Sequence, residues 1–348
     1  MSGAGAARGP GLPALDGLRA ISIACVLAAH LLPLGPKDLR LNEAAGAMGM
    51  SLFFALSGFL ILRALHSDGI VPFAVKRMAR ILPLAALFCL AAFLLFSQSP
   101  AQLLAGLGFV LNYMPGLMIP QTEHLWSLCV EVHFYLFAAA LAACGRRMLA
   151  LVWPCCLAVT ALRMSQGAQI SILTHLRIDE ILAGACVASA LQLSNRTIPA
   201  RRGGPLRAQA VWSAAALVWF AAAHPAGGAL QYLRPYSAAL LLAASLALPA
   251  GCRLSRLLGS RQLSHVAAIS YALYVLHPLT ARGWWDAGSL SERYGIKRPL
   301  GFALTLAAAH LSTYHWERWW IAAARRALAR RSPGGSIAPA PQALRAGE

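Results

Sequence analysis

The chain has 348 residues, of which 58% are hydrophobic and 12% are charged, whereas soluble globular domains carry about 25% charged residues. So few polar groups cannot cover a water-exposed surface, and the same composition excludes disordered, collagen-like and coiled-coil chains. The basic residues behind the net charge of +18 lie between apolar segments, as in cytoplasmic loops of membrane proteins, so we expect a lipid bilayer and no nucleic acid as partner.

Apolar segments long enough to cross a membrane recur along the chain. A spanning helix needs about 20 mostly apolar residues. We predict an all-α fold, a polytopic membrane protein with about ten transmembrane helices. The predicted spans lie near residues 14–34, 45–65, 81–97, 125–144, 148–162, 174–194, 209–223, 232–249, 263–281 and 299–320.

The rest of the chain is divided as follows. Segment 101–119 is apolar but contains three glycines, a proline and an asparagine, so we expect a re-entrant or partly helical segment packed inside protein. Residues 1–11 form a cytosolic tail, too short and polar for a signal peptide, and 12–322 form one transmembrane domain. Residues 323–348 are predicted to be a basic, disordered cytosolic tail.

The eight cysteines lie mostly within apolar segments and show no C-x-x-C or Cys/His ligand spacing. Cysteines in such positions behave as small apolar core residues. We therefore expect neither a disulfide framework nor a metal site.

The distribution of Lys and Arg predicts the orientation. With the N-terminus in the cytosol, eighteen of these residues fall in the connections on the cytosolic side and seven in those on the opposite side. Cytoplasmic connections carry the excess of positive charge. Both termini are therefore expected in the cytosol, with an even number of spans.

Two ionisable residues lie in the first span. Such residues cost at least about 2.5–3.5 kcal/mol on insertion scales and are candidate functional groups. Arg19 and His30 are eleven residues apart, which is about three helical turns, so they face the same way about 16 Å apart. Alone, Arg19 could be an arginine reaching the membrane surface and His30 a core histidine. Their shared register favours a functional polar stripe.

Arg77 and Arg80 stand three residues apart, directly before an apolar span, and share a helix face. Guanidinium groups so arranged suit a phosphorylated ligand, because each can donate two hydrogen bonds to phosphate oxygens. The alternative is a topology signal that only contacts lipid head groups. The local sequence leaves both interpretations open.

The segment 124–137 contains Ser127, Glu131 and Tyr135 at intervals of four residues, on one helix face. A carboxylate within a membrane helix needs a partner, usually a His or Arg from another span. Trp126 is either part of the same site or an interfacial anchor. Later segments supply further candidates for ligand binding or support, which are Arg177, Tyr274 and His277.

Five segments, in this order, resemble the acyltransferase-3 family of bacterial multi-pass membrane acyltransferases, part of a wider transmembrane acyltransferase superfamily. They are LDGLRAISIACVLAAH at 15–30, GMSLFFALSGFLI at 49–61, KRMARILP at 76–83, HLWSLCVEVHFY at 124–135 and ISYALYVLHPL at 269–279. The resemblance covers residues 12–320. No single motif is decisive, but five in the right order are strongly specific.

The resemblance implies transfer of an acyl group, usually acetyl from acetyl-CoA, to a hydroxyl of a cell-surface carbohydrate at the bacterial inner membrane. The family's functional residues correspond to Arg19, His30, Arg77, Arg80 and Glu131. The two residues after Glu131 differ from the Glu-Gln of many members, and we assign them no role. Many members carry a C-terminal extracytoplasmic SGNH-type domain, which we do not expect here because the chain ends about 28 residues after its last predicted span.

These assignments predict a mechanism. Arg77 and Arg80, with Arg19 at the channel mouth, hold the phosphates of acyl-CoA on the cytosolic side. His30 acts as general base towards the acceptor hydroxyl, because imidazole titrates near neutral pH, and Glu131 orients it. An acyl-histidine intermediate is the open alternative. Acyl-CoA is a co-substrate, and no permanently bound cofactor is expected.

The acceptor is open between lipopolysaccharide, other surface or lipid-linked polysaccharide, and a macrolide sugar. A transporter or flippase of lipid-linked sugars also has intramembrane charges, but it does not need a paired Arg aligned with a His, and no internal repeat is visible. A structural assembly subunit is disfavoured by the register of Arg19 and His30.

Overall fold

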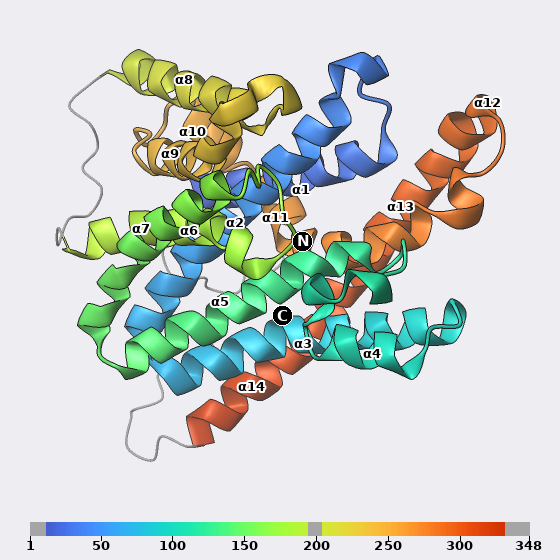
Figure 1. The fold of residues 1–348 in the computed structure, drawn as a ribbon, viewed down its shortest axis with the longest axis horizontal. Coiled ribbons are helices and arrows are strands. Elements are labelled where there is room, and N and C mark those ends of the chain that lie inside the picture. The colour runs from blue at the N-terminus through green and yellow to red at the C-terminus, as the bar shows by residue number, and fades with distance from the viewer. Residues whose placement is uncertain (1–11, 194–203, 331–348) are drawn as a thin grey trace, which may run out of the picture.

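The computed structural model describes residues 12–193 and 204–330, and all regular elements within these ranges are helical (Figure 1). The α-helices are α1 (Pro13–Leu31), α2 (Leu41–Asp68), α3 (Ile70–Leu95), α4 (Pro100–Leu107), α5 (Trp126–Ala143), α6 (Val152–Ser165), α7 (Asp179–Leu193), α8 (Pro205–Ala223), α9 (Arg234–Leu246), α10 (Arg253–Leu258), α11 (Arg261–Leu276), α12 (Leu290–Glu292), α13 (Arg298–Leu311) and α14 (Arg318–Arg330). The predicted all-α class is confirmed.

Within the described ranges, six helical segments are long and apolar enough to cross a membrane. They are Pro13–Leu31, Lys37–Asp68, Ile70–Leu95, Glu123–Ala143, Arg147–Ser165 and Pro205–Ala223. The other four predicted spans, around α7, α9, α11 and α13, are not among these six segments. Helices α7, α9 and α11 have 13 to 16 residues and fall short of the usual spanning length, whereas α13 is part of a longer helix described below. The prediction of about ten spans is therefore not confirmed.

Two predicted boundaries are resolved by the structure. Segment 101–119 is partly helical, as expected: α4 begins with a capping box between Ser99 and Gln102, and short 3-10 turns follow it. At the other end, α13 continues through a π-helical turn (Ser312–Glu317) into α14, which ends at Arg330. The helix thus includes residues 323–330, which were expected in the disordered tail. Residues 1–11 and 331–348, the other predicted tail segments, lie outside the described residues.

Helix α2 is the central helix, in contact with α1, α3, α5, α7, α8 and α9 (Figure 1). Glycines permit its closest contacts. A Cβ atom at Gly58 would overlap the backbone of Ile181 on α7, and one at Gly184 would overlap the backbone of Ala55 on α2. Small residues that let backbones touch are the usual means of packing helices in lipid.

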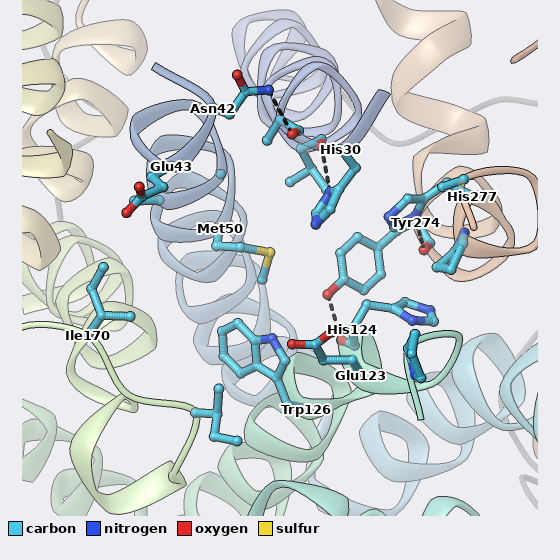
Figure 2. A pocket seen from close by; sticks show the side chains of 18 of the residues that line it. His30, Asn42, Glu43, Met50, Glu123, His124, Trp126, Ile170, Tyr274 and His277 are labelled. Carbon is cyan, nitrogen blue, oxygen red and sulfur yellow. Dashed lines mark hydrogen bonds between the residues drawn. The ribbon is translucent and has the colours of Figure 1, made fainter. Parts of the chain in front are cut away.

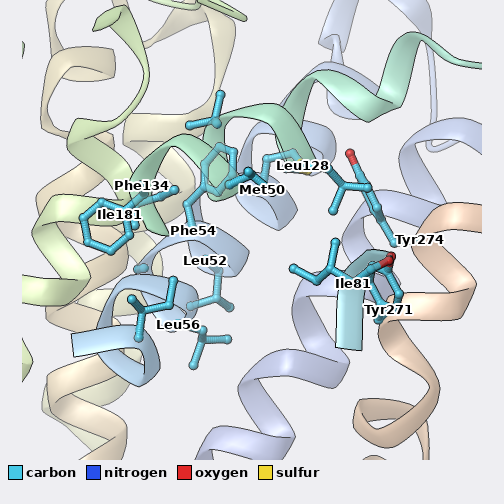
Figure 3. Close-up of a cluster of buried hydrophobic side chains, with 14 of the residues drawn as sticks. Met50, Leu52, Phe54, Leu56, Ile81, Leu128, Phe134, Ile181, Tyr271 and Tyr274 are labelled. Atoms are coloured by element: carbon cyan, nitrogen blue, oxygen red, sulfur yellow. The ribbon is translucent and has the colours of Figure 1, made fainter. Parts of the chain in front are cut away.

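The apolar core follows α2 and reaches α11 (Figure 3). Figure 3 shows Met50, Leu52, Phe54 and Leu56 of α2 with residues of α3, α5, α7 and α11. The hydroxyl of Tyr271 satisfies its hydrogen bond inside this core, because it donates to the backbone oxygen of Ile81 at 2.6 Å. The core thus ties α3 to α11.

Candidate active site

A pocket of about 520 Å³ lies among the ends of α1, α2, α5 and α11 and the segments 120–124, 170–177 and 278–282 (Figure 2). This volume is in the range of small-molecule sites. Five predicted site residues line it: His30, Trp126, Arg177, Tyr274 and His277. Residues more than 240 positions apart in the chain therefore meet in one cavity.

His30 occupies the last turn of α1, which runs without interruption from Pro13 and keeps the predicted register with Arg19. Nδ1 of His30 lies 2.9 Å from the backbone oxygen of Val26. A carbonyl oxygen can only accept, so Nδ1 carries the hydrogen and Nε2 keeps its lone pair. In Figure 2 the rings of His30, Tyr274 and Trp126 surround the same space.

A second layer of aromatic side chains forms the wall beside His30. The ring centroid of His277 lies 5.1 Å from that of His30 and 5.4 Å from that of His124. The hydroxyl of Tyr274 donates to the backbone oxygen of His124 at 2.7 Å and lies 2.6 Å from the hydroxyl of Ser127. Ser127 thus lies behind the pocket wall, in contact with Tyr274.

His124 was not predicted as a site residue. It stands two residues before Trp126 in the same sequence motif, which was the only available signal. Its Nε2 donates to the backbone oxygen of Val275 at 3.1 Å, and this bond fixes the start of α5 against α11. No periodicity in the sequence shows a contact between segments 151 positions apart.

Arg177 joins the pocket to a buried charge network. Its guanidinium lies 5.3 Å from the ring centroid of Trp126 and 3.2 Å from the carboxylate of Glu180. Glu180 also pairs with Arg234 at 2.7 Å, and both of these side chains are fully buried. The network thereby fixes one wall of the pocket.

Asp179 continues this network with a different partner. Its carboxylate lies 2.6 Å from Nη1 of Arg163, again with both side chains fully buried. Asp179 pairs with Arg163 of α6, and Arg177 pairs with Glu180.

A second polar site, which we call the arginine cluster, lies in the N-terminal half of α1, around Arg19. Arg77 and Arg80 lie near enough to Arg19 for their positive charges to repel that of its guanidinium group. The guanidinium of Arg77 lies 5.8 Å from the ring centroid of Tyr135. The cluster consists of Arg19, Arg77, Arg80, Glu131 and Tyr135.

Glu131 belongs to the arginine cluster and not to the pocket. Its carboxylate accepts hydrogen bonds from Tyr135 at 2.6 Å and from Ser57 at 3.2 Å, and its charge acts on Arg19. The expected bond between Glu131 and the imidazole of His30 is not formed, since the partners of Glu131 are Ser57 and Tyr135 and that of His30 is Val26. The reason is the helix repeat, which places Glu131 about 10 Å along α5 from His124 at the pocket wall.

The three arginines of this cluster form no ion pair with a carboxylate of the described residues, so their positive charges are available to a ligand. Among the described residues, no carboxylate lies within 4 Å of the guanidinium groups of Arg19, Arg77 or Arg80. Guanidinium groups without a carboxylate partner suit an anion with several oxygens, such as a phosphate. In the same part of the chain, no group of three or more His, Cys, Asp or Glu residues could hold a metal ion.

Comparison with known proteins supports a family assignment. Residues 12–314 match the sequence model of the acyltransferase-3 family, described as an acyltransferase domain. The O-acetyltransferases OatA of Staphylococcus aureus strains NCTC 8325 / PS 47 and COL are 30% identical to the chain over 150 residues. This similarity covers 36% of the chain and 24% of either relative, so the chain spans about a quarter of the length of the curated relatives it matches. No solved structure matches the chain. The match over residues 12–314 shows that the chain belongs to the acyltransferase-3 family and is an acyltransferase.

Proposed function

We propose that the protein is a membrane O-acetyltransferase, which moves an acetyl group from acetyl-CoA to a hydroxyl of a cell-surface or lipid-linked carbohydrate. The observation that carries the proposal is the placement of two polar sites along the same helices. Arg19 lies in the second turn of α1 and His30 in its last turn, about 16 Å apart by helical rise. Ser127 and Tyr135 repeat this arrangement on α5, about 12 Å apart.

The arginine cluster is the donor end. Acetyl-CoA carries phosphates at one end and its thioester at the other, so its two ends need different surroundings. Arg77 and Arg80 bind phosphate oxygens with their guanidinium groups, and Arg19 supports them at the base of α1. The pantetheine arm then extends along α1 towards His30.

The pocket is the acceptor end. His30, with its free lone pair at Nε2, removes the proton of an acceptor hydroxyl, which attacks the thioester carbonyl. The carbon–sulfur bond breaks, and the proton passes from His30 to the departing thiolate of CoA. Trp126, Arg177 and Tyr274 shape the space for the carbohydrate. Transfer through an acyl-histidine uses the same residues.

The orientation follows the excess of Lys and Arg on one side. The arginine cluster faces the cytosol, where acetyl-CoA is made, and the pocket opens on the opposite side of a bacterial inner membrane. Both termini are then cytosolic. The acceptor is a surface polysaccharide such as lipopolysaccharide, or its lipid-linked precursor.

The experiment compares the native bacterium carrying the wild-type protein, His30→Ala or the matched control His310→Ala. His310 is exposed and lies on α13, outside both sites. Acetate released from the envelope by mild base is measured at equal protein levels in membranes. His30→Ala should remove the acetate that depends on this protein, and His310→Ala should retain it. Wild-type acetylation in membranes with His30→Ala would overturn the proposal.

A further inference from the structure

The hydrogen bonds of two histidines fix which nitrogen of each ring can accept a proton. Nδ1 of His277 lies 2.7 Å from the backbone oxygen of Tyr274, as Nδ1 of His30 does from that of Val26. Both Nδ1 atoms therefore carry hydrogen, and both Nε2 atoms keep their lone pairs. Nε2 of His277 has no hydrogen-bond partner among the described residues, and it remains in contact with the cavity although the residue is only 1% exposed.

The two imidazole rings are in direct contact. Their centroids are 5.1 Å apart, and the ring planes are inclined to each other by 44°. In the resting state both Nε2 atoms carry lone pairs, and two lone pairs cannot form a hydrogen bond with each other. Once His30 has taken a proton at Nε2, it becomes a donor and His277 is the adjacent acceptor.

Most other polar groups near His30 already have partners. Nε2 of His124 donates to the backbone of Val275, and the Tyr274 hydroxyl donates to the backbone of His124. Nδ1 of His124 is buried without a partner among the described residues, but the ring of His124 packs against that of His277. At the rim, Glu123 faces Arg282 at 3.9 Å. Within the described chain, no carboxylate is hydrogen-bonded to His30, whose recorded bond is to Val26.

We propose that His277 is the positioning residue that stabilises the protonated form of His30 by accepting its Nε2 hydrogen. This inference rests on the proposed function and assigns to His277 the role expected of Glu131. During transfer, the acceptor O–H bond breaks, its proton goes to Nε2 of His30, and the oxygen forms a bond to the acetyl carbonyl. The carbon–sulfur bond breaks, and the proton, held between His30 and His277, goes to the CoA thiolate. The products are the acetyl ester and CoA.

Two substitutions separate this role from a structural one. A glutamine amide places its polar atoms near the Nε2 position of a histidine, and an asparagine amide places them near Nδ1. His277→Gln keeps an acceptor for His30 and loses the bond to the Tyr274 backbone. His277→Asn keeps a donor for that backbone bond and loses the acceptor.

The assay uses everted membrane vesicles of the native bacterium, which expose the cytosolic face to added radiolabelled acetyl-CoA and enclose the native acceptor. His277→Asn should lower kcat about ten- to hundredfold, the value of one hydrogen bond to a charged group, with KM for acetyl-CoA unchanged. His277→Gln should retain most of kcat. His310→Gln is the matched control and should behave as wild type.

The outcomes separate the inference from the proposed function. If His277→Asn is active and His277→Gln is not, His277 only anchors the backbone, and the inference is wrong although His30→Ala remains inactive. Equal activity of both variants with wild type also overturns it. If His30→Ala itself transfers acetyl groups normally, the proposed function fails first.

Discussion

The carboxylate of Glu131 accepts a 2.6 Å hydrogen bond from the hydroxyl of Tyr135, one helical turn further along α5. Both groups are buried. This bond, together with that from Ser57, holds the carboxylate of Glu131 in place within the arginine cluster. The sequence placed Glu131 beside His30, whereas its contacts place it beside the proposed donor phosphates.

The first prediction concerns this bond. Tyr135→Phe removes one donor to a buried carboxylate and should lower the free energy of unfolding by about 1 kcal/mol, a typical net value for one hydrogen bond, because Ser57 still donates to the same carboxylate. Thermal unfolding of the purified protein in detergent measures the change. Tyr113→Phe, at an exposed tyrosine that bonds to His175, is the control and should change stability less. Equal losses of unfolding free energy in the two variants would show that the buried bond to Glu131 stabilises the protein no more than the exposed bond of Tyr113.

The second prediction concerns donor binding. Arg77→Ala and Arg80→Ala should each weaken acetyl-CoA binding about tenfold, and Lys should restore little of it where the contact is bidentate. Calorimetry with the purified protein in detergent gives the Kd. Arg63→Ala is the matched control, because Arg63 is an exposed arginine of α2 stacked on Phe59. An unchanged Kd in both cluster variants would show that Arg77 and Arg80 do not bind the donor and that they serve only as a topology signal.

The third prediction concerns the buried charge network. Asp179→Ala leaves the buried cation of Arg163 without its partner and should destabilise the protein by about 3–5 kcal/mol. Glu43→Ala breaks the exposed pair with Arg40, which has the same 2.6 Å separation, and should cost no more than about 1 kcal/mol. Chemical unfolding of both variants is the measurement. Similar losses in the two would mean that burial of the Arg163 pair is not decisive.

Much of the fold was predictable, because span length and apolar composition are local properties. The predicted first span, 14–34, corresponds to α1, and 209–223 corresponds to α8. Helix α9 has 13 residues, and hydropathy alone extended the predicted span 232–249 beyond it. Composition shows where apolar residues lie but not where hydrogen bonding ends a helix.

The candidate site was predictable where one helix carries it and unpredictable where partners come from elsewhere. Arg19 and His30 follow from helix register. The bonds of Glu131 to Ser57 and Tyr135 depend on the packing of α2 against α5. Arg163 is one of the seven basic residues counted above in connections on the side opposite the cytosol, because it follows the predicted span 148–162, yet its side chain is fully buried against Asp179. Contacts between residues on different helices leave no periodic pattern in the sequence, so they could not be predicted from it.

The fourth prediction concerns sidedness. In a background without cysteines, Gln121→Cys should react with an impermeant maleimide in intact cells, because it adjoins Pro120 at the pocket. Ser67→Cys, at the exposed end of α2, should react only after permeabilisation. Labelling of both from the same side would contradict the proposed orientation.

The most direct test of transfer across the membrane compares two vesicle preparations given radiolabelled acetyl-CoA from outside. Everted vesicles expose the arginine cluster in the proposed orientation, and right-side-out vesicles expose the pocket. Acetyl groups should enter the native glycan in everted vesicles only, and His30→Ala should abolish this incorporation. Equal incorporation in sealed right-side-out vesicles would contradict a donor site on the cytosolic face and an acceptor site on the other.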